Sequence, residues 1–212
     1  MLHLYEEHGP DCLARMNGQF ALAIWDARKK ELFLARDRVG IRPLYYTILD
    51  NTLIFASEIK SIFANKNVSR RIDPIAMDQI FTFWTTLTPR TVFEDVYELP
   101  PGHYLKTSNG KVIIRKYWDI PLYPRDEQFD LAPREICRRV LELLTDAVRI
   151  RLRADVPVGC YLSGGLDSSG TTALVVRNFN KNVRTFGIRF DSAGYDEGVY
   201  QSLMVRHLNV NH

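Results

Sequence analysis

The chain has 212 residues, of which 46% are hydrophobic and 25% are charged, and its formal net charge is +3. This composition is typical of a soluble globular protein, and so small a positive charge, without a long basic run, argues against nucleic acid as a partner. No apolar stretch reaches the roughly 20 residues of a membrane-spanning helix. The three cysteines are widely spaced, which fits reduced thiols better than disulfides or a zinc site. We therefore expect a cytoplasmic protein, and the lack of a long apolar stretch predicts no membrane partner.

The first half of the chain is predicted to combine short helices with antiparallel strands. Helical segments are expected at residues 2–8 and 12–16, after which β-branched and aromatic runs alternate with turn residues, as at Asp50 and Asn51. An Asn-Gly pair that starts at Asn109 predicts a β-hairpin. Together these elements make an α+β arrangement. The expected strands are 19–27, 31–37, 44–49, 52–57, 103–107 and 111–117, with helices at 59–64 and 74–83.

The second half of the chain is predicted to be a separate domain. Three prolines and several charges between residues 121 and 133 are typical of a linker, so we expect one domain at 1–122, a linker at 123–133 and a second domain at 134–212. Apolar residues three and four apart predict a helix over 134–152 that packs against a sheet. A βαβ unit with parallel strands is predicted next. Its expected elements are strands at 158–162 and 183–190, a helix at 169–177 between them and a further helix at 201–208.

A loop rich in serine and glycine, SGGLDSS at residues 163–169, separates the predicted strand and helix of this βαβ unit. Two consecutive glycines let the backbone turn tightly and approach a ligand, and the amide N–H groups at the start of the helix can bind an anion. Serine hydroxyls can donate to phosphate oxygens, and Asp167 can hold a Mg²⁺ that is shared with a polyphosphate. Because the loop has no lysine, it is not the GxxxxGK[ST] nucleotide loop. We interpret it as a pyrophosphate site; the alternative is an ordinary Ser-Gly loop.

Motifs along essentially the whole chain resemble those of one enzyme family. They are NGQFA at 17–21, ARDRVGIRPLYY at 35–46, ASEIK at 56–60, LPPGH at 99–103, ADVPVG at 154–159 followed by YLSGGLDSS at 161–169, TFGI at 185–188 and GYDE at 194–197. The first four resemble the glutaminase domain of glutamine-dependent asparagine synthetases, and the others resemble the ATP-pyrophosphatase domain of the same enzymes. The combination and the order of the motifs make the resemblance specific.

The resemblance implies a fold and an activity. The implied fold is the C-terminal part of an Ntn-type αββα glutaminase domain, followed by the start of a parallel-sheet, adenine nucleotide α-hydrolase-like domain, so α+β and then α/β. In that family the first domain hydrolyses glutamine, and the ammonia passes to the second domain. There ATP adenylates the side-chain carboxylate of aspartate, and ammonia displaces AMP. The implied substrates are therefore glutamine, aspartate and ATP, and the implied cofactor is Mg²⁺. The resemblance implies no nucleic acid partner, and it is compatible with a homo-oligomer.

The resemblance also assigns residues to the nucleotide. Backbone groups at Leu162 and Ile188 would lie against the adenine on two neighbouring strands, and Asp167 would be the metal ligand. The full set of implied nucleotide-binding residues is Leu162, Ser163, Gly164, Gly165, Leu166, Asp167, Ser168, Ser169 and Ile188.

No catalytic residue is assigned in the glutaminase half. The family's nucleophile is a cysteine directly after the initiator methionine, where this chain has Leu2, so we expect a fragment that lacks both ends, binds ATP poorly and makes no asparagine alone. Cys12 is expected to be a buried structural thiol. Arg36, Asp37 and Arg42 either support the glutamine pocket or the domain interface, or form an ion-pair network that fixes the loop at residues 39–43. The second interpretation is favoured.

Three alternatives for the parent protein stay open. It is an amidotransferase paralogue that acts on a carboxylate other than aspartate, a β-lactam-synthetase-like relative without a glutaminase cysteine, or a non-catalytic remnant that pairs with an intact synthetase. The residues with which the family recognises aspartate are expected after His212, so the motifs of this chain do not distinguish the acceptors.

Overall fold

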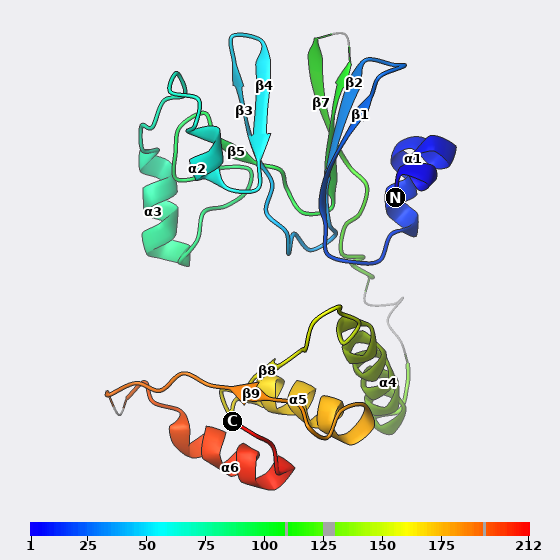
Figure 1. Ribbon diagram of the computed structural model, residues 1–212, viewed down its shortest axis with the longest axis vertical. Helices are drawn as coiled ribbons and strands as arrows, with labels where there is room; N and C mark the ends of the chain where they lie inside the picture. The colour runs from blue at the N-terminus through cyan, green and yellow to red at the C-terminus, as the bar shows by residue number, and fades with distance from the viewer. Residues whose placement is uncertain (109, 125–129, 193) are drawn as a thin grey trace. The chain divides into compact units, whose positions relative to one another are not determined.

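The computed structural model describes residues 1–108, 110–124, 130–192 and 194–212. The chain divides into two compact units, Met1–Leu122 and Tyr123–His212 (Figure 1). Asn109 of the predicted hairpin turn and residues 125–129 of the predicted linker lie outside the described residues. Within the described ranges, no helix has both the length and the apolar character that a membrane crossing requires.

The first unit begins with two short helices and continues into an antiparallel sheet. α1 (Leu2–His8) has the predicted bounds, and a 3₁₀ helix, η1 (Gly9–Arg15), covers most of the second predicted helical segment. The sheet has the strand order β1-β2-β6-β7, and every neighbouring pair is antiparallel, as predicted. Its strands are β1 (Ala21–Asp26), β2 (Glu31–Arg36), β6 (His103–Ser108) and β7 (Lys111–Lys116).

A second, smaller sheet in this unit has the strand order β4-β3-β5. β3 and β4 are joined by the predicted turn and form a hairpin, in which Asp50 and Asn51 both have positive φ (46° and 60°), as the tightest hairpin turns require. The sequence does not predict β5, because this strand has only two residues and depends on pairing with a distant strand, β3, where Tyr45 lies opposite Glu98. The strands are β3 (Tyr45–Leu49), β4 (Thr52–Ala56) and β5 (Tyr97–Glu98).

Two helices follow the β3–β4 hairpin. α2 (Ile59–Ile62) is shorter than predicted, and α3 (Pro74–Phe83) has the predicted bounds. Asp73 explains where α3 begins, because its carboxylate accepts the N–H groups of Ile75 and Ala76 at 2.9 and 3.3 Å. A proline occupies the first helical position, where its missing N–H costs no hydrogen bond.

Three hydrophobic cores separate four layers in the first unit. α1 and η1 pack on one face of the larger sheet, where Leu13 meets Phe33. The other face of that sheet packs on the smaller sheet through Leu34 and Tyr46. α2 covers the remaining face of the smaller sheet, around Ile62. The order of the layers is therefore helix, sheet, sheet, helix, and β2 contributes side chains to the first two cores.

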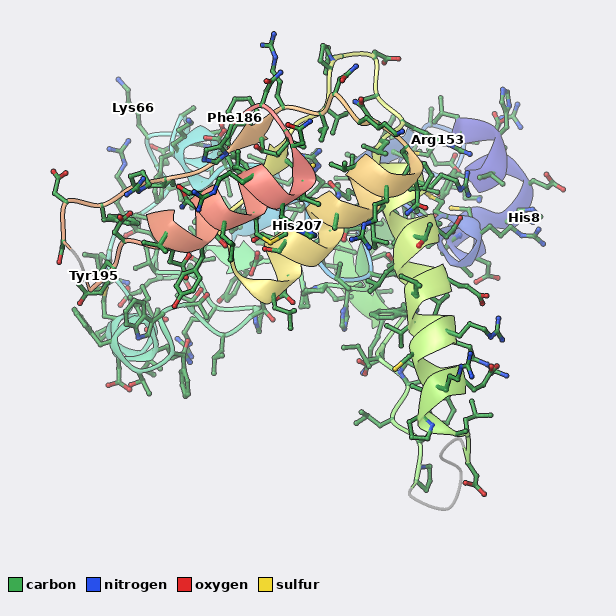
Figure 2. All side chains as sticks on the ribbon, turned by 90° about the horizontal axis from the view of Figure 1, so that it is seen from below. His8, Lys66, Arg153, Phe186, Tyr195 and His207 are labelled. Carbon is green, nitrogen blue, oxygen red and sulfur yellow. The ribbon has the colours of Figure 1, made fainter. Side chains whose placement is uncertain are left out.

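The second unit contains the predicted βαβ unit. β8 (Cys160–Tyr161) and β9 (Thr185–Phe186) pair in parallel, and α5 (Leu166–Asn178) connects them. The chain continues into α6 (Gly198–Leu208), and α5 and α6 lie side by side (Figure 2). Buried residues from these elements form the core of the unit, namely Val175, Val183, Leu208 and Val210.

The parallel strands are shorter than predicted, with two residues each instead of 158–162 and 183–190. The pairing closes with the hydrogen bond from Leu162 N–H to the Phe186 carbonyl (2.8 Å). In the described part of the chain, no further backbone bond joins the two strands beyond this point. Beyond this point, the Ile188 carbonyl accepts a side-chain hydrogen bond from α6.

Both α5 and α6 begin three residues before their predicted starts. Ser169 N–H donates to the Gly165 carbonyl (3.0 Å), and Gln201 N–H donates to the Glu197 carbonyl (3.1 Å). These bonds close the first turn of each helix. Residues 166–169 of the predicted loop at 163–169 therefore form the first turn of α5.

The prediction that the helix over 134–152 packs against a sheet is wrong. α4 (Pro133–Arg151) meets α5 near its C-terminal end, where Val148 joins the core, and it extends away from α5 over the rest of its length (Figure 2). Strands of two residues offer no sheet face long enough for a helix of 19 residues. None of the residues of α4, all of which are described, is buried. Its exposed apolar residues are Ile136, Val140, Leu141, Leu143 and Leu144.

Candidate functional site

The motif SGGLDSS begins after the end of β8 and runs through the first turn of α5, in the predicted order of strand, loop and helix. The N–H groups of Leu166, Asp167 and Ser168 precede the first bond within the helix, so no carbonyl of the helix accepts them. No side chain in the described ranges caps this end of α5. The positive end of the helix dipole therefore faces the loop with free donors, an arrangement that suits an anion.

Two serines of the motif hold the loop in shape. The hydroxyls of Ser163 and Ser168 lie 3.0 Å apart, and Ser168 Oγ also donates to the Gly165 carbonyl (3.2 Å). Ser163 Oγ accepts the N–H of Gly165 at 3.2 Å. Ser169 differs from them, because its Oγ is buried and has no hydrogen-bond partner among the described residues. A buried hydroxyl without a partner is costly, so this atom fits a site that a polar ligand completes.

Gly164 allows α6 to pack directly on the loop. Its φ is +88°, in the left-handed region that side chains disfavour. A Cβ at this position would lie 2.5 Å from Tyr200 Cβ and 2.7 Å from Gln201 N. Because one of these contacts is with the backbone of α6, no side-chain rotation could relieve it. The first turn of α6 therefore fixes the path of the loop.

Leu162 and Ile188 follow the ends of the two parallel strands. Leu162 is fully buried, whereas the side chain of Ile188 is exposed. The Leu162 N–H makes the last bond of the ladder, to Phe186, and the Ile188 carbonyl accepts Gln201 Nε2 at 2.9 Å. The carboxyl ends of neighbouring parallel strands are where open α/β sheets bind ligands. The structure thus brings Ile188 to the same edge as the SGGLDSS motif.

Asp167 lies exposed in the first turn of α5, with its carboxylate available to solvent. No group of three or more His, Cys, Asp and Glu side chains that could hold a metal is found in the described ranges. Mg²⁺ is commonly bound by one or two carboxylates together with phosphate oxygens. A lone carboxylate beside an anion site fits that mode of binding and does not fit a metal site made by the protein alone.

An ion pair that the sequence does not predict shapes the segment after Ile188. Arg189 donates to both oxygens of Asp196 (2.8 and 2.7 Å), and Asp196 also accepts the N–H of Phe190 (3.3 Å). The hydrogen bond from Arg189 is the main cause that lowers the pKa of Asp196 to about 2. The GYDE motif points to Asp196, but its partner Arg189 lies within a predicted strand and carries no separate signal.

We expect the carboxyl of Asp196 to titrate near pH 2, and Arg189→Gln to raise this midpoint toward the ordinary value of 3.8. The cause is the loss of the charged bidentate partner. Carboxyl ¹³C NMR of both proteins measures the midpoints. Glu135, whose pKa is lowered to about 2 by Arg138 and Arg139, serves as the control and should not change. Equal midpoints for Asp196 in the two proteins would contradict the assignment.

Arg36 in the first unit uses its guanidinium to fasten a loop and a strand. It donates to the carbonyls of Arg42 (2.9 Å), Gly40 (2.7 Å) and Leu99 (2.9 Å). It also pairs with Glu98 of β5 at 2.7 Å. Arg36 thus fixes the loop, as the favoured interpretation predicts, but its ion-pair partner is Glu98 of β5, a strand that the sequence does not predict.

Asp37 fixes the same loop from the other side. Its carboxylate accepts the N–H groups of Arg42 (3.0 Å), Ile41 (3.0 Å) and Phe20 (3.2 Å), and its side chain is buried. Burial by itself would raise the pKa of Asp37, but these amide hydrogen bonds outweigh it and hold the pKa below its ordinary value. Arg42 takes part through its backbone, so the network consists mainly of bonds from side chains to the backbone.

Cys12 is a buried thiol, as predicted. It lies in η1 within the first hydrophobic core, and only 1% of its surface is exposed. Burial is the main cause that raises the pKa of its thiol. A buried thiol with a raised pKa is a poor nucleophile.

Two known families match the chain. The family described as "Glutamine amidotransferase domain" matches residues 1–118, and the family described as "Asparagine synthase" matches residues 139–212. The first match covers more than half of the chain and coincides with most of the first compact unit. The second match contains β8, the SGGLDSS motif and α6.

Two curated relatives have names that combine glutamine hydrolysis with asparagine synthesis, in line with the two matched families, glutamine amidotransferase and asparagine synthase. The chain is 37% identical, over 90% of its length, to glutamine-hydrolysing asparagine synthetase 3 of Bacillus subtilis, and 36% identical, over 100% of its length, to a putative glutamine-hydrolysing asparagine synthetase 2 of Methanocaldococcus jannaschii. It is 41% identical, over 82% of its length, to "Amidase chry2" of Gibberella zeae. The chain spans 31%, 41% and 26% of these three relatives. The family matches, the relatives and the order of the motifs agree, and the chain therefore belongs to the glutamine-dependent asparagine synthetase family.

Proposed function

We propose that the protein acts in glutamine-dependent asparagine synthesis, as an ATP-dependent carbon–nitrogen ligase. Glutamine supplies ammonia, ATP adenylates the side-chain carboxylate of aspartate with release of pyrophosphate, and ammonia displaces AMP. The observation that carries the proposal is the SGGLDSS motif at the junction of a parallel strand and an uncapped helix. It stands in one chain with a glutamine amidotransferase domain, in the order found in the family.

The site fits the departure of pyrophosphate. When the aspartate carboxylate attacks the α-phosphorus, negative charge develops on the leaving diphosphate, and fixed donors stabilise that charge best. The N–H groups of Leu166, Asp167 and Ser168, with the unpartnered hydroxyl of Ser169, are such donors. Asp167 is the residue that would hold Mg²⁺, and the ion would supply further neutralisation of the phosphate charges.

We further propose the domain assignment and the fold type. Residues 1–122 form part of a glutamine amidotransferase type 2 domain of the Ntn type, 123–133 form the linker, and 134–212 belong to the ATP-pyrophosphatase domain. The helix, sheet, sheet, helix order of the first unit and its boundary at Leu122 support this division. We assign no glutaminase nucleophile within the described residues, because the thiol of Cys12 is buried.

The test is release of pyrophosphate from ATP that depends on aspartate, measured on the protein that contains this chain together with the expected aspartate-recognition residues, with ammonium as the nitrogen source so that glutamine hydrolysis is not needed. We expect release to require aspartate and Mg²⁺. Asp167→Asn should raise the Mg²⁺ concentration for half-maximal release at least roughly tenfold, because a carboxylate ligand is lost. Asp130→Asn, the same change at an exposed residue outside the motif, is the matched control. An unchanged Mg²⁺ requirement in Asp167→Asn would remove the metal assignment, and absence of release would remove the proposed reaction.

A second candidate function differs only in the acceptor. The relative named "Amidase chry2" is 41% identical to this chain, which favours an amidotransferase paralogue as an alternative. In the same assay, release of pyrophosphate with another carboxylate and not with aspartate would support this alternative. Binding of ATP without release in the presence of any carboxylate would support a non-catalytic protein.

A further inference from the structure

Gln201 is a buried polar side chain of α6 that reaches the backbone beyond β9. Only 3% of its surface is exposed. Its Nε2 donates to the Ile188 carbonyl at 2.9 Å, and its Oε1 is buried without a hydrogen-bond partner in the described part of the chain. Because a carbonyl oxygen can only accept, the NH₂ end of the amide must face Ile188. The orientation of the side chain is thus determined by its one partner.

Gly187 makes room for this amide. A Cβ at Gly187 would lie 2.6 Å from Gln201 Oε1 and 2.9 Å from its Cδ. The amide group therefore rests directly on the backbone of the residue before Ile188. A glycine on one side and a buried amide on the other hold the peptide groups of this segment in one orientation.

The backbone of Ile188 faces the edge where the nucleotide is proposed to bind. The next bond of the parallel ladder would join Ile188 N–H to the Leu162 carbonyl, and it is not formed within the described ranges. The N–H of Ile188 thus stays available as a donor. The Ile188 carbonyl has two lone pairs, of which Gln201 occupies one, so the other can accept a second hydrogen bond. One donor and one acceptor on a single residue match the Watson–Crick edge of adenine, where N1 accepts and the 6-amino group donates.

We propose that Gln201 is a positioning residue that sets the Ile188 peptide to select a 6-aminopurine over a 6-oxopurine. This inference rests on the proposed nucleotide function of the site. A 6-oxo group would place an acceptor against the Ile188 carbonyl, and a site that pairs with a substrate N–H discriminates against such an analogue. Without the amide of Gln201, the Ile188 carbonyl can turn, and the distinction is lost.

The experiment compares ATP, inosine triphosphate and inorganic pyrophosphate, each with Mg²⁺, by NMR titration of the chain labelled with ¹⁵N-isoleucine and ¹⁵N-glycine. Inosine triphosphate has a 6-oxo group in place of the 6-amino group, and pyrophosphate lacks the base. We expect the chain to bind ATP roughly tenfold more tightly than inosine triphosphate, the effect of one or two hydrogen bonds. ATP should shift the amide signal of Ile188, and pyrophosphate should shift only Gly164 and Gly165.

Gln201→Met keeps the length of the side chain and removes the amide. We expect this variant to reduce the preference for ATP to about twofold or less while pyrophosphate binds as before, because one hydrogen bond to the carbonyl is lost. Gln79→Met, the same substitution in α3 of the other unit, is the matched control and should keep the preference. If the role of Gln201 were purely structural, Gln201→Met would weaken the binding of all three ligands by the same factor, and that result would overturn the inference.

The outcomes separate this inference from the proposed function. If the unsubstituted chain bound neither ATP nor pyrophosphate, both would be overturned. If it bound both ligands but the preference for ATP survived Gln201→Met, only the role of Gln201 would be overturned. If Gln201→Met did not fold, Gln201→Glu would decide, because it keeps the size of the side chain and removes the NH₂ donor to Ile188: a lost preference for ATP supports the inference, and a preserved preference overturns it.

Discussion

Replacing Gly164 with alanine should weaken the binding of pyrophosphate and of ATP roughly 100-fold, because both strain and steric overlap act on the loop. The glycine has a φ of +88°, and the added Cβ would lie 2.5 Å from Tyr200 Cβ and 2.6 Å from its carbonyl carbon. To relieve these contacts, the loop must move away from α6, and the bond between Ser163 and Ser168 then breaks. Dissociation constants of the variant and of the unsubstituted chain, from the same NMR titrations, measure the effect.

Gly170 provides the matched control for this substitution. It lies within α5, its φ is not in the left-handed region, and a Cβ there would meet no atom within 4 Å. Gly170→Ala should therefore leave binding unchanged and stabilise the helix by about 0.5–1 kcal/mol. If Gly164→Ala bound pyrophosphate as tightly as Gly170→Ala, the loop would not be the site of the diphosphate.

Replacing Asp37 with alanine should lower the free energy of unfolding of the first unit by about 3 kcal/mol, because buried N–H groups lose their acceptor. The groups concerned belong to Phe20, Ile41 and Arg42. The three tryptophans of the chain, Trp25, Trp84 and Trp118, all lie in this unit. Urea unfolding followed by tryptophan fluorescence therefore reports on the first unit alone.

The effect of Asp37→Ala should depend on pH in one direction. The pKa of Asp37 is lower in the folded protein than its ordinary value of 3.8, so its charge stabilises the folded state above that ordinary pKa. This stabilisation is lost as the pH falls through the folded-state pKa. The difference between the two proteins should be largest near neutral pH and shrink in acid. Asp78→Ala, at an exposed position of α3, is the control and should change stability by less than about 0.5 kcal/mol. An equal effect of the two substitutions would refute the structural role of Asp37.

Local signals explain most of the predicted elements. Asp50 and Asn51 predict a hairpin because they tolerate positive φ, and the turn has positive φ at both positions. Asp73 followed by a proline is typical of the start of a helix, and α3 begins there. In the SGGLDSS motif, two glycines next to a helical pattern place the turn correctly, and the start of α5 is wrong by three residues because the first turn closes at Gly165.

What the sequence could not predict depends on contacts between distant residues. β5 depends on pairing with β3, and Glu98 forms an ion pair with Arg36, which lies 62 positions earlier in the sequence. The apolar stripe of α4 predicts a sheet against one face, but no residue of α4 is buried in the structure. Gln201 lies in a predicted helix, and nothing local distinguishes it from an exposed glutamine. Its role depends on its distance from Ile188, which only the fold determines.

The place of β2 between two cores has a consequence for how this protein can change over evolution. Phe33 and Ala35 point into the core beneath α1, while Leu34 points into the core shared by the two sheets. Since neighbouring residues of a strand share one backbone, a larger side chain on one face displaces those on the other. Mutations accepted on one side therefore restrict which mutations are tolerated on the opposite side, and compensating pairs should arise across this strand more often than within either core alone.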